Sequence, residues 1–308
     1  MNPVPGSELK ARVNSKLASA GLTGSILVRD LDSGRSVGID TDRLYPLASL
    51  AKLPLALAVL DQIAAGHLDG AGRIRVQPGR VGTPGPTGTT RFRHHADLAL
   101  DDLVYLCVSL SDNAAADALF ELVPPAEVSA SLAAWGIGAV SIRHGFADHT
   151  RTPTETLPRS EVAFAHSMAI GEVTAGGGHR LHQLDVTSTN SGSAQGLSDL
   201  LAMIWSSGTE GPLPRPSVQA RERLRELLAA NVHRQRLAPD FASDSALWSS
   251  KTGTLLNLRH EAGVVEHDDG TRVSVTVLTE SHVAAAIQPY AEHVMGEIAR
   301  DLHDHVRA

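Results

Sequence analysis

The chain has 308 residues, of which 42% are hydrophobic and 20% are charged, a composition that excludes a disordered chain and allows a sizeable core. Lysine and arginine number 27 against 34 acidic residues, which leaves a net charge of -7, and no basic run is interleaved with aromatic residues, so we expect neither nucleic acid nor a membrane surface as a partner. The single cysteine, Cys107, excludes an intrachain disulfide and a cysteine-based metal site.

Hydrophobic spacing predicts the elements. Leu9, Val13 and Leu17 recur every four residues, as on one face of a helix, and 53–60 is apolar all round, as in a buried helix. Strict alternation over 272–279 predicts a half-buried strand. In chain order we expect a helix over 7–20, strands over 24–30 and 36–39, helices over 53–60, 98–123, 126–135, 196–205 and 218–232, strands over 247–253, 261–266 and 272–279, and a helix over 289–306.

Two segments lack a clear periodicity of hydrophobic residues. Residues 79–88 form a Pro/Gly-rich loop, and 143–190 contains several Pro and Gly signals, so we treat it mainly as an extended loop with a helix near 161–170. A loop of this length in a compact protein is usually functional.

The element order predicts an α/β part plus an all-α part. A mainly antiparallel sheet, built from residues near 24–48 and 245–280, is flanked by the two terminal helices, and a helical insert packs on it. We expect one lobe from 1–48 and 240–308, a second from 49–239, and the active site between them. Residues 1–6 lack the features of a signal peptide and no stretch reaches about 18 apolar residues. As written, the chain is expected in the cytoplasm; a removed leader would make it secreted.

The first chemical motif is Ser49-Leu50-Ala51-Lys52. On a helix, residues three apart share a face, so the Lys52 amine can reach the Ser49 hydroxyl and act as its base. A lysine that is neutral near pH 7 needs its pKa lowered by about three units, about 4 kcal/mol. Burial supplies part of this shift and a second nearby cation supplies the rest. The motif therefore predicts a nucleophilic serine with another lysine close by.

The second motif is Ser111-Asp112-Asn113. The Ser111 hydroxyl can relay a proton to a leaving group, and Asn113 can hold both a substrate amide carbonyl and the Lys52 amine. The motif follows the first by about 60 residues.

The third motif is Lys251-Thr252-Gly253 on a late strand, followed by Thr254. It supplies the second cation, a hydroxyl for a substrate carboxylate, and a glycine that lets backbone approach the ligand. The backbone N–H groups of Ser49 and Thr254 are expected to form an oxyanion hole.

Two similar patterns are rejected as sites. The serine of Ser7-Glu8-Leu9-Lys10 is better explained as the N-cap of a surface helix. Ser188-Thr189-Asn190 follows the long loop instead of opening a buried helix. Cys107 lies in an apolar stretch and is expected to be a buried structural thiol. The histidines are scattered and no H-E-x-x-H occurs, so neither a metal nor another cofactor is expected.

Together, SLAK, SDN and KTG in this order resemble the class A β-lactamase and penicillin-binding superfamily over nearly the whole chain. More narrowly the chain is similar to actinobacterial β-lactamase-like serine hydrolases. That likeness is carried by 80–88, 189–205, 251–260 and 263–266. The resemblance implies that Arg259 points toward a substrate carboxylate.

The resemblance fails at one point. Class A enzymes carry an E-x-x-L-N motif whose Glu activates the deacylating water, and this sequence lacks it. An ungapped reading places Phe146-Ala147-Asp148-His149 there; Asp148 and Glu155, and also Glu161, are candidates for the base, although a solvated carboxylate is the simpler explanation of each. Acylation is therefore better supported than turnover.

Three functions follow from these motifs. The leading one is β-lactam hydrolysis through an acyl-serine intermediate. The second is an esterase, amidase or D-Ala-peptidase-like enzyme on another carboxylate-bearing small molecule. The third is a penicillin-binding or sensor protein that becomes acylated without turnover.

Overall fold

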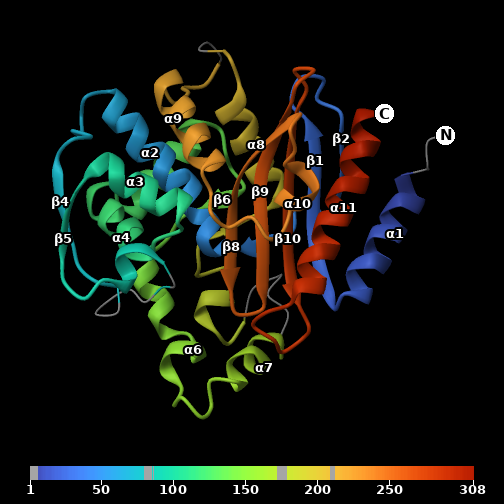
Figure 1. Cartoon of the computed structure of the whole chain (residues 1–308), viewed down its shortest axis with the longest axis horizontal. Coiled ribbons are helices and arrows are strands. Elements are labelled where there is room, and N and C mark those ends of the chain that lie inside the picture. The colour runs from blue at the N-terminus through green and yellow to red at the C-terminus, as the bar shows by residue number, and fades with distance from the viewer. Residues whose placement is uncertain (1–5, 80–84, 86, 172–178, 209–211) are drawn as a thin grey trace.

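A five-stranded antiparallel sheet with the order β2-β1-β10-β9-β8 is the main sheet of the structure, a computed structural model (Figure 1). Its strands are β1 (Leu22–Asp30), β2 (Ser36–Ile39), β8 (Ala246–Leu255), β9 (Leu258–His267) and β10 (Arg272–Ser281). The two ends of the chain meet in it, because β1 pairs with β10 so that Leu22 lies opposite Ser281. The predicted sheet is confirmed with one correction. Residues 40–48 leave it, since β3 (Tyr45–Pro46) pairs instead with β7 (Ser191–Gly192).

The terminal helices α1 (Gly6–Ser19) and α11 (Pro289–Arg307) lie together beside the β1 side of this sheet (Figure 1). The predicted face of α1, with Leu9, Val13 and Leu17, is buried in a core that it shares with α11 and with one face of the strands. Lys16 and Asp301 join the two helices through an ion pair of 2.9 Å. Both flanking helices expected from the sequence are therefore confirmed.

A second core lies among the helices of the insert and the other face of the sheet. The longer helices are α2 (Lys52–Ala64), α3 (Leu100–Ser109), α4 (Asn113–Leu122), α5 (Pro125–Ala134), α8 (Ala194–Trp205) and α9 (Val218–Ala229). Residues 52–60 of α2 are all buried, as their all-round apolar character predicted. The helix expected over 98–123 is instead two helices, because Ser111 adopts a φ of 60° that no helix tolerates.

The remaining elements are short and mostly missed by the sequence patterns. They are β4 (Arg73–Val76), β5 (Ala96–Ala99), β6 (Val140–Ser141), α6 (Pro153–Thr156), α7 (Phe164–Ile170), α10 (Ala238–Phe241) and the 3₁₀ turns η1 (Ala48–Ala51), η2 (Gly88–Arg91), η3 (Phe146–Arg151) and η4 (His182–Leu184). The helix expected near 161–170 is present as α7. The other described residues of 143–190 include η3, α6 and η4, which the sequence patterns did not predict.

The structure describes residues 6–79, 85, 87–171, 179–208 and 212–308. Most of the predicted loop 79–88 and the glycines 176–178 lie outside these residues, and so do the side chains of Ser7 and Glu155. Within this part of the chain, every helix is too short or too polar to cross a membrane.

Candidate active site

Ser49 lies in the short turn that leads into the buried helix α2. The residue before it, Ala48, has a φ of 48°, a left-handed backbone that costs a non-glycine residue free energy and that often marks functional sites. The neighbours Ala48, Leu50 and Ala51 are buried, whereas Ser49 is only half-buried. The turn therefore holds one hydroxyl where solvent can reach it and fixes the surrounding backbone.

Lys52 joins the first two motifs. Its buried ammonium donates to Ser111 O at 2.7 Å and to Asn113 Oδ1 at 2.6 Å, and lies 3.3 Å from both Ser49 Oγ and Ser111 Oγ. Burial lowers the pKa of Lys52 to about 8, against the opposing pull of the nearby Asp112 carboxylate. A lysine that loses its proton this readily can accept one from the hydroxyl beside it.

Lys251 approaches the same place from β8. Its Nζ donates to Ser111 Oγ at 2.9 Å and to Thr252 O at 2.9 Å. Burial lowers the pKa of Lys251 well below its ordinary value, and the charge of Lys52 lowers it further. The structure thus brings Ser49, Lys52, Ser111 and Lys251 into one hydrogen-bonded chain, with the Ser111 hydroxyl between two lysines.

Asp112 explains how the second motif holds its shape. Its buried carboxylate caps α4, since Oδ1 accepts from Ala114 N at 3.0 Å. The other oxygen accepts from both the backbone N and the hydroxyl of Thr89. An N-cap of this kind satisfies donors that a helix leaves open. Asp112 therefore fixes the strained Ser111 on one side of it and Asn113 on the other.

Gly253 lets the third motif approach the turn that carries Ser49. A Cβ built on this residue would lie 2.9 Å from Leu47 O and 3.3 Å from Leu50 Cγ, in the turn that carries Ser49. Only a residue without a side chain permits this contact. Thr254, the next residue, is exposed on β8, which is the edge strand of the main sheet.

Arg236 is a supporting residue that sequence reasoning missed. It is buried just before α10, and its guanidinium donates to Gly253 O, His260 O and Thr254 Oγ1 at 3.1, 2.9 and 2.7 Å. Its Nε pairs with Glu292 of α11 at 2.8 Å. The only sequence signal was an Arg in a basic run, His233-Arg234-Gln235-Arg236, which a surface loop also shows.

Arg259 is hydrogen-bonded within the protein. Its guanidinium donates to four backbone carbonyls, those of Leu256, Leu258, Ala285 and Ala286, and only 2% of the residue is exposed. Burial lowers its pKa to about 10, and the charge of Arg236 adds to this shift. Both terminal nitrogens of the guanidinium are thus engaged within the protein. Arg259 therefore holds the turns beside β9, and its expected contact with a substrate carboxylate stays a prediction.

The carboxylates proposed for deacylation are not found in the described contacts of Lys52. The Asp148 side chain is 43% exposed and its Oδ2 lies 3.6 Å from His144 Nδ1. Glu161 is exposed, and the side chain of Glu155 lies outside the described residues. Phe146 takes the adjoining place, with its ring centroid 4.3 Å from Lys52 Nζ.

The rejected motif at 188–190 has a structural role. Ser188 Oγ donates to the carbonyls of His182 and Asp185. Asn190 is buried, and its Oδ1 accepts from Arg143 N at 2.7 Å and from His144 N at 3.1 Å. This amide therefore holds the backbone just before Phe146.

Cys107 is buried on α3, close enough to the two lysines to affect their charge. Burial raises the pKa of its thiol to about 12, so the thiolate needed for nucleophilic chemistry does not form near neutral pH. This buried position agrees with the prediction that Cys107 is a structural thiol.

Comparisons with known proteins agree on one group. The model of the β-lactamase enzyme family matches residues 8–306. The β-lactamase regulatory protein BlaB of Streptomyces cacaoi is 52% identical over 304 residues, which are 97% of each chain. A β-lactamase structure from Sphaerobacter thermophilus DSM 20745 has a TM-score of 0.74 at 21% identity and covers 99% of both chains. A PBP-A variant in an acyl-enzyme complex with penicillin G has a TM-score of 0.72 at 19% identity, over 97% of this chain and 96% of that one. At these identities the two structures show the shared fold.

Proposed function

The chain belongs to the β-lactamase enzyme family, and from this premise we propose that β-lactams acylate Ser49 and that the acyl group is released slowly. The observation that carries the proposal is the hydrogen-bonded chain from Ser49 through Lys52 and Ser111 to Lys251. It contains a hydroxyl, a base beside it and a proton relay, which are the groups that acyl transfer to serine needs.

The acylation step follows from these contacts. Neutral Lys52 takes the proton of Ser49 Oγ, which bonds to the β-lactam carbonyl carbon. The backbone N–H groups of Ser49 and Thr254 stabilise the oxyanion. The ring C–N bond then breaks, and the nitrogen takes the proton of the Ser111 hydroxyl, which Lys52 reprotonates. Lys251, whose Nζ lies 2.9 Å from Ser111 Oγ, stabilises the negative charge that develops there.

Binding of the small-molecule substrate is assigned to groups around this chain. Lys251 and the Thr252 hydroxyl are proposed to bind its carboxylate, Gly253 leaves room for it, and Asn113 donates to its amide carbonyl. Arg259 is kept apart from this set, because both terminal nitrogens of its guanidinium are engaged within the protein. We place the site where two lobes meet. One lobe is formed by 1–48 and 240–308, and the other by 49–239.

Slow release makes a sensing role the second candidate. Two observations favour it: Phe146 occupies the place beside Lys52, and the 52% identical relative is named a regulatory protein. Rapid β-lactam hydrolysis, and turnover of another carboxylate-bearing ester or amide, are the competing outcomes. Both use the same acyl-serine and differ in the release step or in the substrate.

Intact-mass measurement after exposure to penicillin G tests the proposal. We expect a single adduct with the mass of one intact penicillin, which Ser49→Ala abolishes and Ser188→Ala leaves in place. A chromogenic cephalosporin should then give a burst of one equivalent followed by slow turnover. Burst-free turnover of about ten per second, an ordinary enzyme rate, would show hydrolysis as the function, and mapping of the adduct to another residue would overturn the site.

A further inference from the structure

His260 is a fully buried histidine whose two ring nitrogens both bond to backbone. It lies on β9, between β8 and β10 in the main sheet (Figure 1). Its Nδ1 accepts from Thr279 N of β10 at 3.1 Å, and its Nε2 lies 3.0 Å from Pro46 O of β3. A backbone N–H can only donate a hydrogen bond, and a carbonyl can only accept one. The ring is therefore neutral, and the proton on Nε2 is donated to Pro46 O.

Burial keeps the ring in this neutral state. It lowers the pKa of His260 to about 3, and the charges of Arg236 and Arg259 also lower it, against the opposing effect of the bond to Pro46 O. A second proton would sit on Nδ1, where it would face the N–H of Thr279. Near neutral pH the ring therefore exchanges no proton, and its role is to hold two backbone groups at a fixed separation.

The imidazole joins the two segments that carry the proposed oxyanion donors. In the main sheet His260 pairs directly with Gly253 of β8, and Thr254 is the next residue on that strand. On the other side, the ring bonds to Pro46, three residues before Ser49. One side chain therefore connects the strand that contains Thr254 to the turn that contains Ser49.

The space between these two segments is closely filled. A Cβ built on Gly253 would lie 3.4 Å from His260 Cβ and 2.9 Å from Leu47 O. Tyr45, the residue before Pro46, packs edge-on against the imidazole, with ring centroids 5.9 Å apart. The bond to Pro46 O and the contact at Gly253 therefore fix together how far β8 lies from the turn.

We propose that His260 is a positioning residue for acylation, because it sets the distance between the backbone N–H groups of Ser49 and Thr254. The inference rests on the proposed function, in which these two groups stabilise the oxyanion. Their hydrogen bonds strengthen as Ser49 Oγ bonds to the carbonyl carbon and the carbonyl oxygen becomes negative. A displaced donor should therefore slow the acylation step and leave the earlier, noncovalent binding of the β-lactam unchanged.

The test follows penicillin G labelling of Ser49 by intact mass at several reagent concentrations. This separates the acylation rate constant from the dissociation constant of the noncovalent complex. His260→Asn keeps an acceptor for Thr279 N but is too short to reach Pro46 O, and we expect acylation to slow about a hundredfold, the scale of one lost oxyanion donor. The dissociation constant should not change.

Two further variants at the same position complete the series. His260→Gln carries an acceptor and a donor on a longer planar amide, and acylation should return to within about threefold of the wild type. His260→Leu covers the case in which His260→Asn does not fold, because it fills more of the ring's volume while making neither bond. Its acylation should be as slow as that expected for His260→Asn.

Another buried histidine provides the matched control for lost stability. His303 of α11 has Nδ1 2.9 Å from Asp304 Oδ1, and its Nε2 lies 2.9 Å from Nε2 of His267, at the other end of β9. His303→Asn should also lower the free energy of unfolding, measured in urea, because it breaks buried contacts. Its acylation rate constant should equal that of the wild type.

Four results would overturn the proposal. They are wild-type acylation in folded His260→Asn or His260→Leu, equal slowing by His303→Asn, slowing that appears only in the dissociation constant, and failure of His260→Gln to restore the rate. The pH profile adds a fifth. The midpoint of acylation against pH should be the same in wild type and His260→Gln, and a displaced midpoint would show that the imidazole acts as an acid or a base.

The outcome for wild-type protein separates this inference from the proposed function. If penicillin G does not label Ser49, acylation by β-lactams is wrong. The same comparison then uses p-nitrophenyl acetate, whose carbonyl oxygen also becomes negative as Ser49 Oγ bonds to its carbon, and the effect of His260 is measured there. Failure of both reagents to acylate Ser49 overturns both proposals.

Discussion

Lys52 is expected to set the pH dependence of the proposed acylation. Its pKa is lowered to about 8, mainly by burial, and only the neutral amine can take the Ser49 proton. The rate should therefore rise about tenfold per pH unit below about pH 8 and level off above it. The measurement is the second-order rate of penicillin labelling across this range. A flat profile from about pH 6 to 9 would assign the base to another group.

Arg259 provides the second test at this scale. Arg259→Ala leaves four carbonyls, of which two are in buried hydrogen bonds, without their donors, and the free energy of unfolding should fall by about 3 kcal/mol. Labelling by an anionic penicillin and by a neutral ester should fall equally. The surface variant Arg223→Ala removes an exposed pair with Glu226 and should change stability by less than about 0.5 kcal/mol. If only labelling by the anionic penicillin slowed, the result would show that Arg259 contacts the substrate carboxylate.

The sequence predicts that Ser49 and Lys52, the residues proposed to react, lie close together, but it does not predict the residues that support them. Ser49 and Lys52 are three residues apart, and a helix places such residues on one face whatever the rest of the chain does. The contact of Phe146 with Lys52, and that of Arg236 with Gly253, join residues distant in sequence. These contacts depend on how whole segments pack, which no local pattern encodes.

At the scale of the elements, β8 packs closely against the turn η1 at Gly253. Gly253→Ala would push a methyl group against Leu47 O, 2.9 Å away, and so displace the strand from Ser49. We expect labelling to slow by about a hundredfold, the scale of a 1 Å misplacement at a reacting centre. Gly138→Ala, where a Cβ meets nothing within 4 Å, is the control and should label normally. Equal rates in the two variants would contradict the close fit.

Long elements with a regular apolar pattern were predicted, and short ones were not. The strands β3, β6 and β7 have only two residues each, too few for any period to show. The break between α3 and α4 was missed because apolar spacing continues across it, while Ser111 leaves the helical region. Asp112 is part of a predicted motif, but its bonds to Thr89 depend on a loop about 20 residues upstream.

At the scale of the whole molecule, the C-terminal helix supports the active-site strand. Glu292 of α11 pairs with the buried Arg236, which holds Gly253 O and Thr254 Oγ1. Glu292→Ala should lower the free energy of unfolding by about 3 kcal/mol, as for a broken buried pair, and slow labelling as well. Urea denaturation and labelling kinetics measure both effects.

A matched control lies on the same helix. Glu297 is 44% exposed and pairs only weakly with His293 at 3.5 Å, so Glu297→Ala should change neither property appreciably. If Glu292→Ala lowers stability without slowing labelling, the helix supports the fold but does not position β8.

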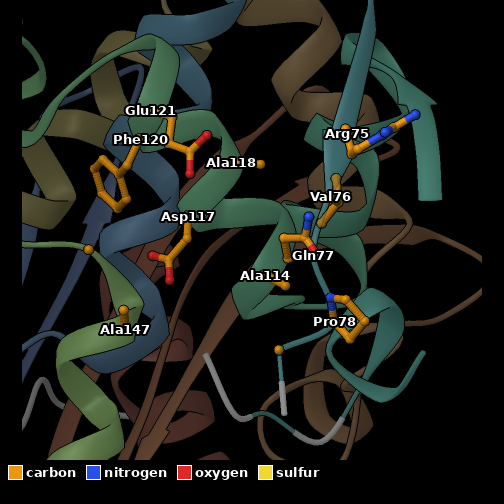
Figure 2. Close-up of a pocket in the computed structure, with 12 residues that line it drawn as sticks. Arg75, Val76, Gln77, Pro78, Ala114, Asp117, Ala118, Phe120, Glu121 and Ala147 are labelled. Atoms are coloured by element: carbon orange, nitrogen blue, oxygen red, sulfur yellow. The ribbon is translucent and has the colours of Figure 1, made fainter. Parts of the chain in front are cut away.

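Cys107 has a practical consequence for following this chemistry. It is the one thiol of the sequence, and it is fully buried with a pKa of about 12. A maleimide fluorophore would therefore leave the native protein unmodified. A cysteine introduced at an exposed position such as Ala147 would be labelled alone, with no need to remove the natural one. The folded chain is thus already a background for a site-specific optical reporter at the pocket that Gly145 and Ala147 line (Figure 2).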